Sequence, residues 1–96
     1  MKVIFTDEAI ENLEQIGDYI ARDSPVRAAS FVAELYSNAL DIGTFPEAYP
    51  IVGRYNKFSV RRCIHGNYLI YYRINSNRVE ILQITHGATN RSPWRF

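Results

Sequence analysis

The segment RRCIHGNYLIYYRI, residues 61–74, consists of two runs rich in β-branched and aromatic residues on either side of Gly66-Asn67. Two such runs with a turn-forming pair between them predict a β-hairpin. Alternation along the second run divides its side chains between two faces, with Tyr68, Ile70, Tyr72 and Ile74 opposite Leu69, Tyr71 and Arg73. Both faces are partly apolar, so we expect this strand to be a central one.

The sequence that follows extends the hairpin into a sheet. RVEILQITH, residues 78–86, is a third run of strand-forming residues, separated from the second by Asn75-Ser76-Asn77. Consecutive strands joined by such short turns predict an antiparallel meander. A further short strand is expected before the first strand of this meander, near residues 52–55.

The N-terminal half has helical periodicity after one short strand, which we expect at residues 2–6. Apolar residues then recur at helical spacing from Ile10 to Ile20. Ser24-Pro25 predicts the start of a second helix, with serine as its cap and proline at its first position. That helix should stop before Phe45-Pro46. Two amphipathic helices with a short link predict an antiparallel hairpin.

The expected fold is therefore α+β, with an N-terminal strand and an α-helical hairpin packed on one face of a small antiparallel β-sheet. Residues 1–96 should form a single globular domain. The other sheet face should stay open or receive a partner. The one cysteine, Cys63, gives neither an internal disulfide nor metal-ligand spacing, and it fits a reduced, cytoplasmic setting. We see no signal peptide and no apolar run of membrane-spanning length.

Charge is distributed unevenly along the chain. Residues 1–50 carry nine acids and three bases, and residues 51–96 carry eight bases and one acid. This split suggests two surfaces of opposite sign, of which the basic one can attract an acidic protein or a nucleic acid. The alternative is two solvated faces that neutralise each other.

The basic segment also contains the groups that a metal-free ribonuclease needs. His65 and His86 could supply a general acid and base, with Arg61, Arg62 and Arg73 on the phosphate. Whether these residues converge does not follow from their spacing, and a histidine at a strand end is more often a capping or packing residue. The chain has no metal-ligand cluster and no glycine-rich phosphate loop, so we expect neither a metal nor a cofactor.

The C-terminal residues HGATNRSPWRF end in Trp94 and Phe96. A tryptophan in such a tail can fold back on its own domain. It can also anchor another protein, because buried aromatic residues dominate interface energies. The sequence leaves both alternatives open.

An ordered set of short elements runs through nearly the whole chain: Tyr19-Ile20-Ala21, Ser24-Pro25, Phe45-Pro46, Gly53-Arg54, Val60-Arg61-Arg62, GNYLIYYR at residues 66–73, and His86-Gly87-Ala88. In this order they resemble the ParE toxins of bacterial toxin–antitoxin modules. The resemblance implies the RelE/ParE-like fold, a helical hairpin on a small antiparallel sheet. It also implies a non-enzymatic toxin that poisons DNA gyrase and is neutralised by a cognate, ParD-like antitoxin, often as a heterotetramer.

On this interpretation, the basic sheet surface and the tail are expected to contact the target or the antitoxin. The candidate contact residues are Arg61, Arg62, Tyr71, Arg73, His86, Arg91 and Trp94. An acidic, initially disordered antitoxin segment would suit a basic, partly apolar groove.

The rival interpretation is the ribosome-dependent messenger-RNA endoribonuclease branch of the same superfamily. That branch typically carries bases along the third strand, after the tyrosine of the central strand and after the last strand, and a tyrosine or similar group in its tail. Here most of these positions hold other residues, namely Val60, Leu69, Thr89 and Arg95, although Arg62 is kept. The sequence also departs from ParE-like chains, because Thr89 and Asn90 precede Arg91 and the tail is short. A non-toxic member that acts only as a binding partner is a third alternative.

Overall fold

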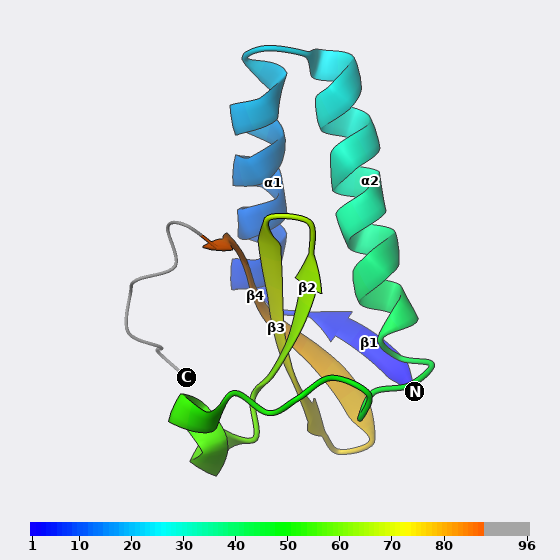
Figure 1. Cartoon of the computed structure of the whole chain (residues 1–96). Coiled ribbons are helices and arrows are strands. Elements are labelled where there is room, and N and C mark those ends of the chain that lie inside the picture. Colours follow the sequence, from blue (N-terminus) through cyan, green and yellow to red (C-terminus); the bar gives the residue numbers. More distant parts are fainter. Residues whose placement is uncertain (88–96) are drawn as a thin grey trace.

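The structure, a computed structural model, describes residues 1–87, except for the side chains of residues 54–56. Its elements in chain order (Figure 1) are β1 (Lys2–Phe5), α1 (Asp7–Ala21), α2 (Pro25–Asp41), the 3-10 helix η1 (Gly53–Phe58), β2 (Arg61–His65), β3 (Tyr68–Asn75) and β4 (Arg78–His86). The expected α+β class is confirmed, because two antiparallel helices pack on one small sheet. No helix within residues 1–87 is both long and apolar enough to cross a membrane.

Helix α2 begins at Ser24, the capping residue that the sequence predicts, and α1 is capped in the same way by Thr6. Thr6 Oγ1 accepts a hydrogen bond from Ala9 N at 3.1 Å, and Ser24 Oγ accepts one from Arg27 N at 3.1 Å. These bonds satisfy amide groups that have no partner inside the first helical turn. Pro25 opens α2, where its missing N–H removes no helical bond.

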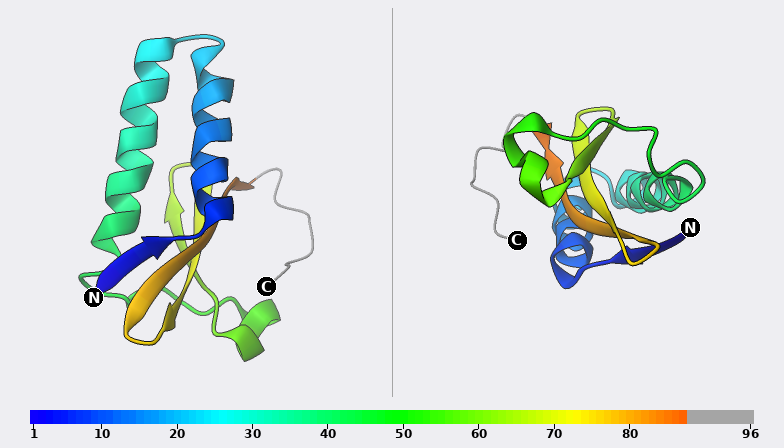
Figure 2. Two further views of the ribbon diagram at one scale, coloured as in Figure 1. Left: turned by 180° about the vertical axis from the view of Figure 1, so that it is seen from behind. Right: turned by 90° about the horizontal axis from the view of Figure 1, so that it is seen from below.

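The sheet has the strand order β1-β4-β3-β2. Strands β2, β3 and β4 form the expected antiparallel meander, and β3 is an inner strand as its two apolar faces predicted. Strand β1, however, pairs with β4 in parallel, Lys2 opposite Arg78, so the sheet is mixed rather than purely antiparallel (Figure 2). The end of β1 is fixed in this direction by Thr6, whose amide donates to Ile81 O at 3.1 Å as the chain enters α1.

The expected strand near residues 52–55 is wrong. Residues 53–58 form η1 instead, and Ile51 just before it makes an isolated bridge to Arg61. The cause is that the chain folds back on itself between Val52 and Val60. Val52 N donates to Val60 O at 2.7 Å, and Ser59 has a φ of +53°, which turns the backbone out of an extended path.

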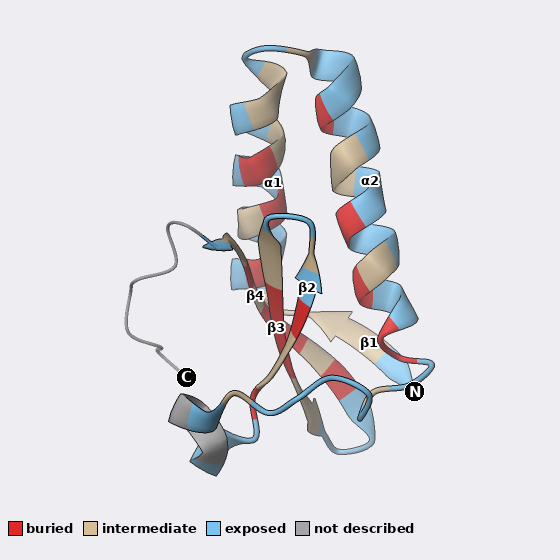
Figure 3. Cartoon of the chain, viewed as in Figure 1, coloured by how far each residue is buried: buried red, intermediate tan, exposed pale blue. Residues whose placement is uncertain are grey.

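Helices cover one face of the sheet, and the segment containing η1 lies on the other side (Figure 2, right; Figure 3). We call these the helix face and the loop face. The buried residues between helices and sheet are Ala9, Leu13, Ile16, Leu35, Ala39, Ile42, Cys63, Ile70, Tyr72, Val79, Ile81 and Ile84. A smaller cluster on the loop face contains Val60, Tyr71 and Leu82, with Val52 and Leu69 packed against it. The expectation of an open second face is therefore wrong at its centre.

A β-bulge in β4 decides which side chains reach each face. Tyr72 lies opposite Ile81 and Tyr71 opposite Gln83, which leaves Leu82 without a partner on β3. One extra residue at this point lets both Ile81 and Ile84 point into the core under the helices. It also moves every later residue of β4 to the face opposite the one that simple alternation predicts.

Candidate functional site

The three arginines of the β2–β3 hairpin lie on different faces of the sheet. Arg61 is the register partner of Tyr72, which packs on the helix face, whereas Arg62 is the partner of Tyr71, which packs on the loop face. Arg73, two residues after Tyr71, shares the loop face. The structure therefore places Arg62 and Arg73 on one face of the sheet and Arg61 on the other.

Arg61 is occupied by its own chain. Its Nη1 atom donates to Tyr49 O at 2.6 Å and to Glu47 O at 3.3 Å. A guanidinium that binds two carbonyl groups of one loop acts as a clamp on that loop. The role of Arg61 in the folded chain is therefore to hold the segment between α2 and η1.

Arg73 is also paired internally. Its Nε atom donates to Glu80 Oε1 at 2.8 Å, and Asn75 Nδ2 donates to Glu80 Oε2 at 3.4 Å. The hydrogen bond from Arg73 is the main cause that lowers the pKa of the Glu80 carboxyl below its usual range. Much of the positive charge of Arg73 is therefore neutralised within the sheet.

Arg62 differs from both. Within residues 1–87, no acid lies within ion-pair distance of its guanidinium, and no side-chain hydrogen bond is formed by it. The side chain is partly exposed on the loop face, next to Ile64 on the same edge strand. Arg62 is therefore the arginine of this hairpin that is available to an acidic partner.

The two histidines lie in one row across the sheet, with Tyr68 between them. Tyr68 is the register partner of His65 on one side and of His86 on the other. The rings of Tyr68 and His86 meet edge to face with centroids 5.1 Å apart, and Phe31 of α2 lies 5.3 Å from Tyr68. All these rings are on the helix face, as packing groups at the end of the core.

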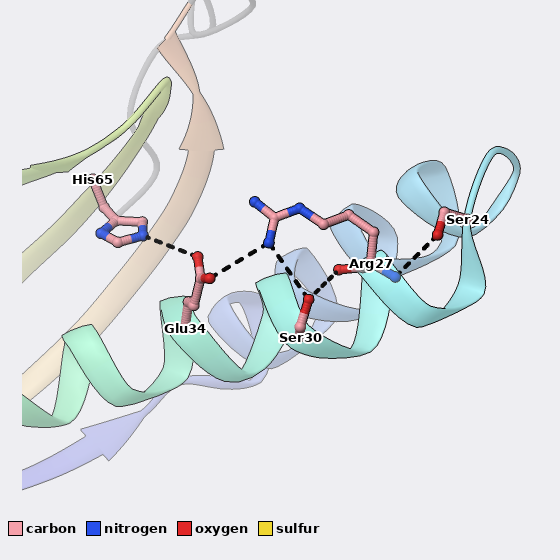
Figure 4. A network of polar contacts seen from close by, with 5 residues as sticks. All are labelled: Ser24, Arg27, Ser30, Glu34 and His65. Carbon is pink, nitrogen blue, oxygen red and sulfur yellow. Dashed lines mark hydrogen bonds and ion pairs between the residues drawn. The ribbon is translucent and has the colours of Figure 1, made fainter.

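His65 also belongs to a polar network on α2 (Figure 4). Its Nε2 atom is 3.8 Å from Glu34 Oε2, and Arg27 Nη1 is 3.4 Å from Glu34 Oε1. Ser30 Oγ accepts from Arg27 and donates back to its carbonyl group. These groups are largely exposed, so the network contributes little to stability and mainly orients His65 toward the helix.

Among the described residues, the cations and the histidine of the expected nuclease site lie on different faces of the sheet. His86 lies on the helix face, whereas Arg62 and Arg73 lie on the loop face. A general acid or base must come within about 3 Å of the proton that it transfers, while the cations contact the same phosphate. The sheet itself separates these groups. Cys63 offers no nucleophile either, since it is 1% exposed and burial raises the pKa of its thiol.

The remaining candidate contact residues fall into two groups. Tyr71 is 2% exposed beneath Val60 and Leu82, so its ring is part of the loop-face cluster. Arg91 and Trp94 lie outside the described residues, as do Thr89 and Arg95. Within residues 1–87, no three metal-ligating side chains are grouped so that they could hold an ion.

Sequence reasoning missed two features of this region. The first is the role of Tyr72, whose hydroxyl donates to Pro46 O at 2.7 Å and whose pKa is raised by burial to about 12. The second is the exposed edge of β2 at Ile64, which is 63% exposed. A signal for the second was present, because the two-residue turn at Gly66-Asn67 fixes which residues of β2 point their amide groups away from β3.

A helical hairpin on a four-stranded mixed sheet defines the chain as a small α+β domain. Arg62, which no acid within residues 1–87 pairs with, lies on the edge strand β2. The model of the family described as the ParE toxin of the type II toxin-antitoxin system, parDE, matches residues 3–91. The chain therefore belongs to this family of toxins.

Two further comparisons agree with this assignment. The chain is 37% identical over 92 residues to a Sinorhizobium fredii protein named "Putative toxin Y4kP". The alignment covers 90% of this chain and 88% of that protein. It also resembles a solved structure, the chromosomal ParDE TA system from P. aeruginosa, with a TM-score of 0.70 over 90% of this chain and 95% of that one. At 19% sequence identity, this second similarity bears on the fold alone.

Proposed function

We propose that this toxin inhibits DNA gyrase by binding it in the cytoplasm, without catalysing a reaction of its own, and that a cognate antitoxin neutralises it. The observation that carries the proposal is the placement of His86 on the helix face, away from Arg62 and Arg73. Hydrolysis of RNA needs these groups around one phosphate. A domain that keeps them apart can still dock on a macromolecule.

Binding is supported by the distribution of charge and apolar surface. Arg62 has no acidic partner among the described residues, and Ile64 beside it is exposed. A cation next to an apolar side chain suits a partner that combines acidic and apolar residues. An antitoxin that covers this surface would block access to the target and would stabilise the folded toxin by mass action. The assembly we expect is a heterotetramer or a larger complex of toxin and antitoxin.

The first test is DNA supercoiling by purified gyrase with ATP, titrated with toxin released from its antitoxin. Loss of supercoiling with accumulation of linear, cleaved DNA is the expected result. Addition of antitoxin should restore supercoiling. Unaffected gyrase, together with cleavage of translated messages that stops in a His86→Ala variant, would establish the endoribonuclease instead.

The second test asks whether Arg62 contributes to docking. An Arg62→Glu variant should bind gyrase and antitoxin at least tenfold more weakly, because an anion replaces the guanidinium cation at the contact. Arg22→Glu is the matched control, since it makes the same charge change at an exposed position next to the α1–α2 link. Equal losses in both variants would mean that only net charge matters, and unchanged binding of Arg62→Glu would exclude Arg62 from either contact.

A further inference from the structure

The loop face of the sheet carries a cation from each of the four strands. Arg62 of β2 and Arg73 of β3 lie on this face. Glu80 is the register partner of Arg73 and shares the face with it. Arg78 of β4, two residues before Glu80, points to the same side, and Lys2 of β1 is the register partner of Arg78. One side of the sheet thus gathers bases that are far apart in the sequence.

Little of this positive charge is neutralised by the sheet itself. Glu80 is the single acid in the four strands and in η1, and it accepts its bond from Arg73 Nε at 2.8 Å. Within residues 1–87, no carboxylate lies within ion-pair distance of the other three cations. The segment η1, which contains exposed Lys57, lies on the same side of the sheet (Figure 2). The loop face is therefore basic as a whole.

Helix α1, on the other side of the sheet, has the opposite charge. It contains no base, and its acids are Asp7, Glu8, Glu11, Glu14 and Asp18. The sheet lies between this helix and the cations of the loop face (Figure 3). A protein with charges arranged in this way approaches a polyanion with its basic side leading, even though its net charge is only +1.

The extent of the basic face suits the backbone of duplex DNA. Four strands that lie about 4.8 Å apart span about 14 Å, which corresponds to about four base pairs at about 3.4 Å each. Arginine and lysine are the residues that most often bind phosphate oxygens, and such contacts carry no sequence information. A duplex offers phosphates along this whole distance, so that several of the cations can be paired at once.

We propose that the loop face contacts the sugar-phosphate backbone of the duplex DNA held by gyrase, without sequence preference. The toxin then binds the complex of gyrase with DNA more tightly than gyrase alone. The inference rests on the proposed function for the identity of the enzyme, whereas the affinity of the face for DNA can be measured without it. By linkage, the toxin should raise the affinity of gyrase for DNA by the same factor.

The first measurement is fluorescence anisotropy of two labelled duplexes of unrelated sequence, titrated with toxin released from its antitoxin. Both duplexes should bind equally. The logarithm of the association constant should fall against the logarithm of salt concentration with a slope of about −3, since each phosphate contact contributes about −0.9. This slope corresponds to contacts from most of the cations on the loop face.

The decisive variant is Arg78→Gln, because Arg78 is exposed and its replacement should leave the fold intact. It should weaken duplex binding about three- to tenfold at about 100 mM salt and make the salt slope shallower by about 0.9. Arg22→Gln is the matched control. It removes the same charge at the far end of α1, where the guanidinium lies 5.7 Å from the centre of the Tyr19 ring, and it should bind DNA as the parent does.

The second measurement compares the affinity of the toxin for gyrase with and without bound DNA. The parent and Arg22→Gln should bind the gyrase–DNA complex about tenfold or more tightly than gyrase alone, and Arg78→Gln should lose most of this difference. Equal affinity for the two forms of gyrase, or a parent-like salt slope in Arg78→Gln, would overturn the inference and leave gyrase inhibition intact.

Two further outcomes separate the inference from the proposed function. Duplex binding that follows the expected salt dependence, with gyrase supercoiling unaffected, would overturn the choice of enzyme but not the contact with DNA. Binding of single-stranded RNA or polyglutamate about tenfold more tightly than of the duplexes would assign the loop face to another polyanion and overturn the inference.

Discussion

Tyr72 shows how one residue can hold a loop that the strands do not reach. It is buried on the helix face, its hydroxyl donates to Pro46 O at 2.7 Å, and the ring of Tyr49 meets it edge to face at 6.4 Å. Arg61 binds the carbonyl groups of Glu47 and Tyr49 in the same loop. Two residues that the sequence offered as strand or contact residues thus fix the segment that leads from α2 toward β2.

Replacement of Tyr72 by phenylalanine should remove this anchor without creating a cavity. The carbonyl group of Pro46 loses its donor, which should lower the free energy of unfolding by about 1 kcal/mol at neutral pH. Chemical denaturation of parent and variant measures the difference. Tyr19→Phe, at an exposed tyrosine, is the control and should leave the denaturation midpoint unchanged.

The same residue predicts behaviour in alkali. Burial raises the pKa of Tyr72 from 10.0 to about 12, so the folded chain holds this proton where the unfolded chain loses it. The contribution to stability is complete below pH 10 and is lost as the pH rises from 10 to about 12. The parent should therefore lose more stability over this range than Tyr72→Phe does. If the free energy of unfolding fell equally with pH in the two proteins, Tyr72 would not be the group responsible.

Glu80 predicts how the stability of the fold changes in acid. The pKa of the Glu80 carboxyl is lowered, chiefly by the hydrogen bond from Arg73. Ionised Glu80 therefore stabilises the fold at any pH above its pKa in the unfolded chain, and this stabilisation is lost as the pH falls through its pKa in the folded chain. Both side chains are partly exposed, and the effect should be about 1 kcal/mol or less. In urea unfolding between pH 7 and pH 3, the free energy of unfolding of Glu80→Gln should fall less steeply with decreasing pH than that of the parent. Glu14→Gln, at an exposed helix position, should follow the parent.

At the level of elements, short-range patterns predicted most of the fold. The caps at Thr6 and Ser24, the strands around Gly66-Asn67 and the hairpin of helices are all local signals. The 3-10 helix and the bulge at Leu82 depend on tertiary contacts, because Val60 and Leu82 are placed by packing against Tyr71. The parallel partner of β1 lies far along the chain. No periodicity within a window of sequence can specify such features.

The turn between β3 and β4 carries a small strain that substitution can remove. Ser76 and Asn77 have φ values of +52° and +64°, as a two-residue turn of this type requires. A serine in the left-handed region is disfavoured by about 1 kcal/mol relative to glycine. We therefore expect Ser76→Gly to raise the free energy of unfolding by up to about 1 kcal/mol. Gly66→Ala, at φ +59°, should have the opposite effect, and thermal unfolding of the pair measures both signs.

The bulge also explains why the candidate site could be predicted only in part. Simple alternation would place His86 on the same face as Glu80 and Arg73, at the other end of the strand. With one extra residue at Leu82, His86 packs against Tyr68 on the helix face instead. The sequence indicates which residue types are candidates, but which of them share a face depends on a single inserted position. The internal partners of Arg61 and Arg73 likewise required the folded chain.

For the whole molecule, the uneven charge along the chain predicts how the toxin meets its antitoxin. The C-terminal half carries an excess of bases, and Arg62 in it has no acidic partner among the described residues. Association with an acidic segment should therefore slow as salt rises from 50 to 500 mM, by about tenfold or more. Dissociation, which depends on short-range packing, should change less. Stopped-flow mixing at several salt concentrations separates the two rates, and a salt-independent association rate would contradict electrostatic attraction.

The parallel pairing of β1 with β4 has a consequence for the time at which the toxin becomes active. Lys2 is among the first residues made by the ribosome, and its partner Arg78 is among the later ones. At about 5–20 residues per second, roughly 4–15 s pass between their syntheses. Strand β4, the last strand within residues 1–87, lies between β1 and β3, and until it is made β1 has no neighbouring strand. Incomplete chains should therefore be harmless to the cell, and an antitoxin already present can capture each toxin as it first closes.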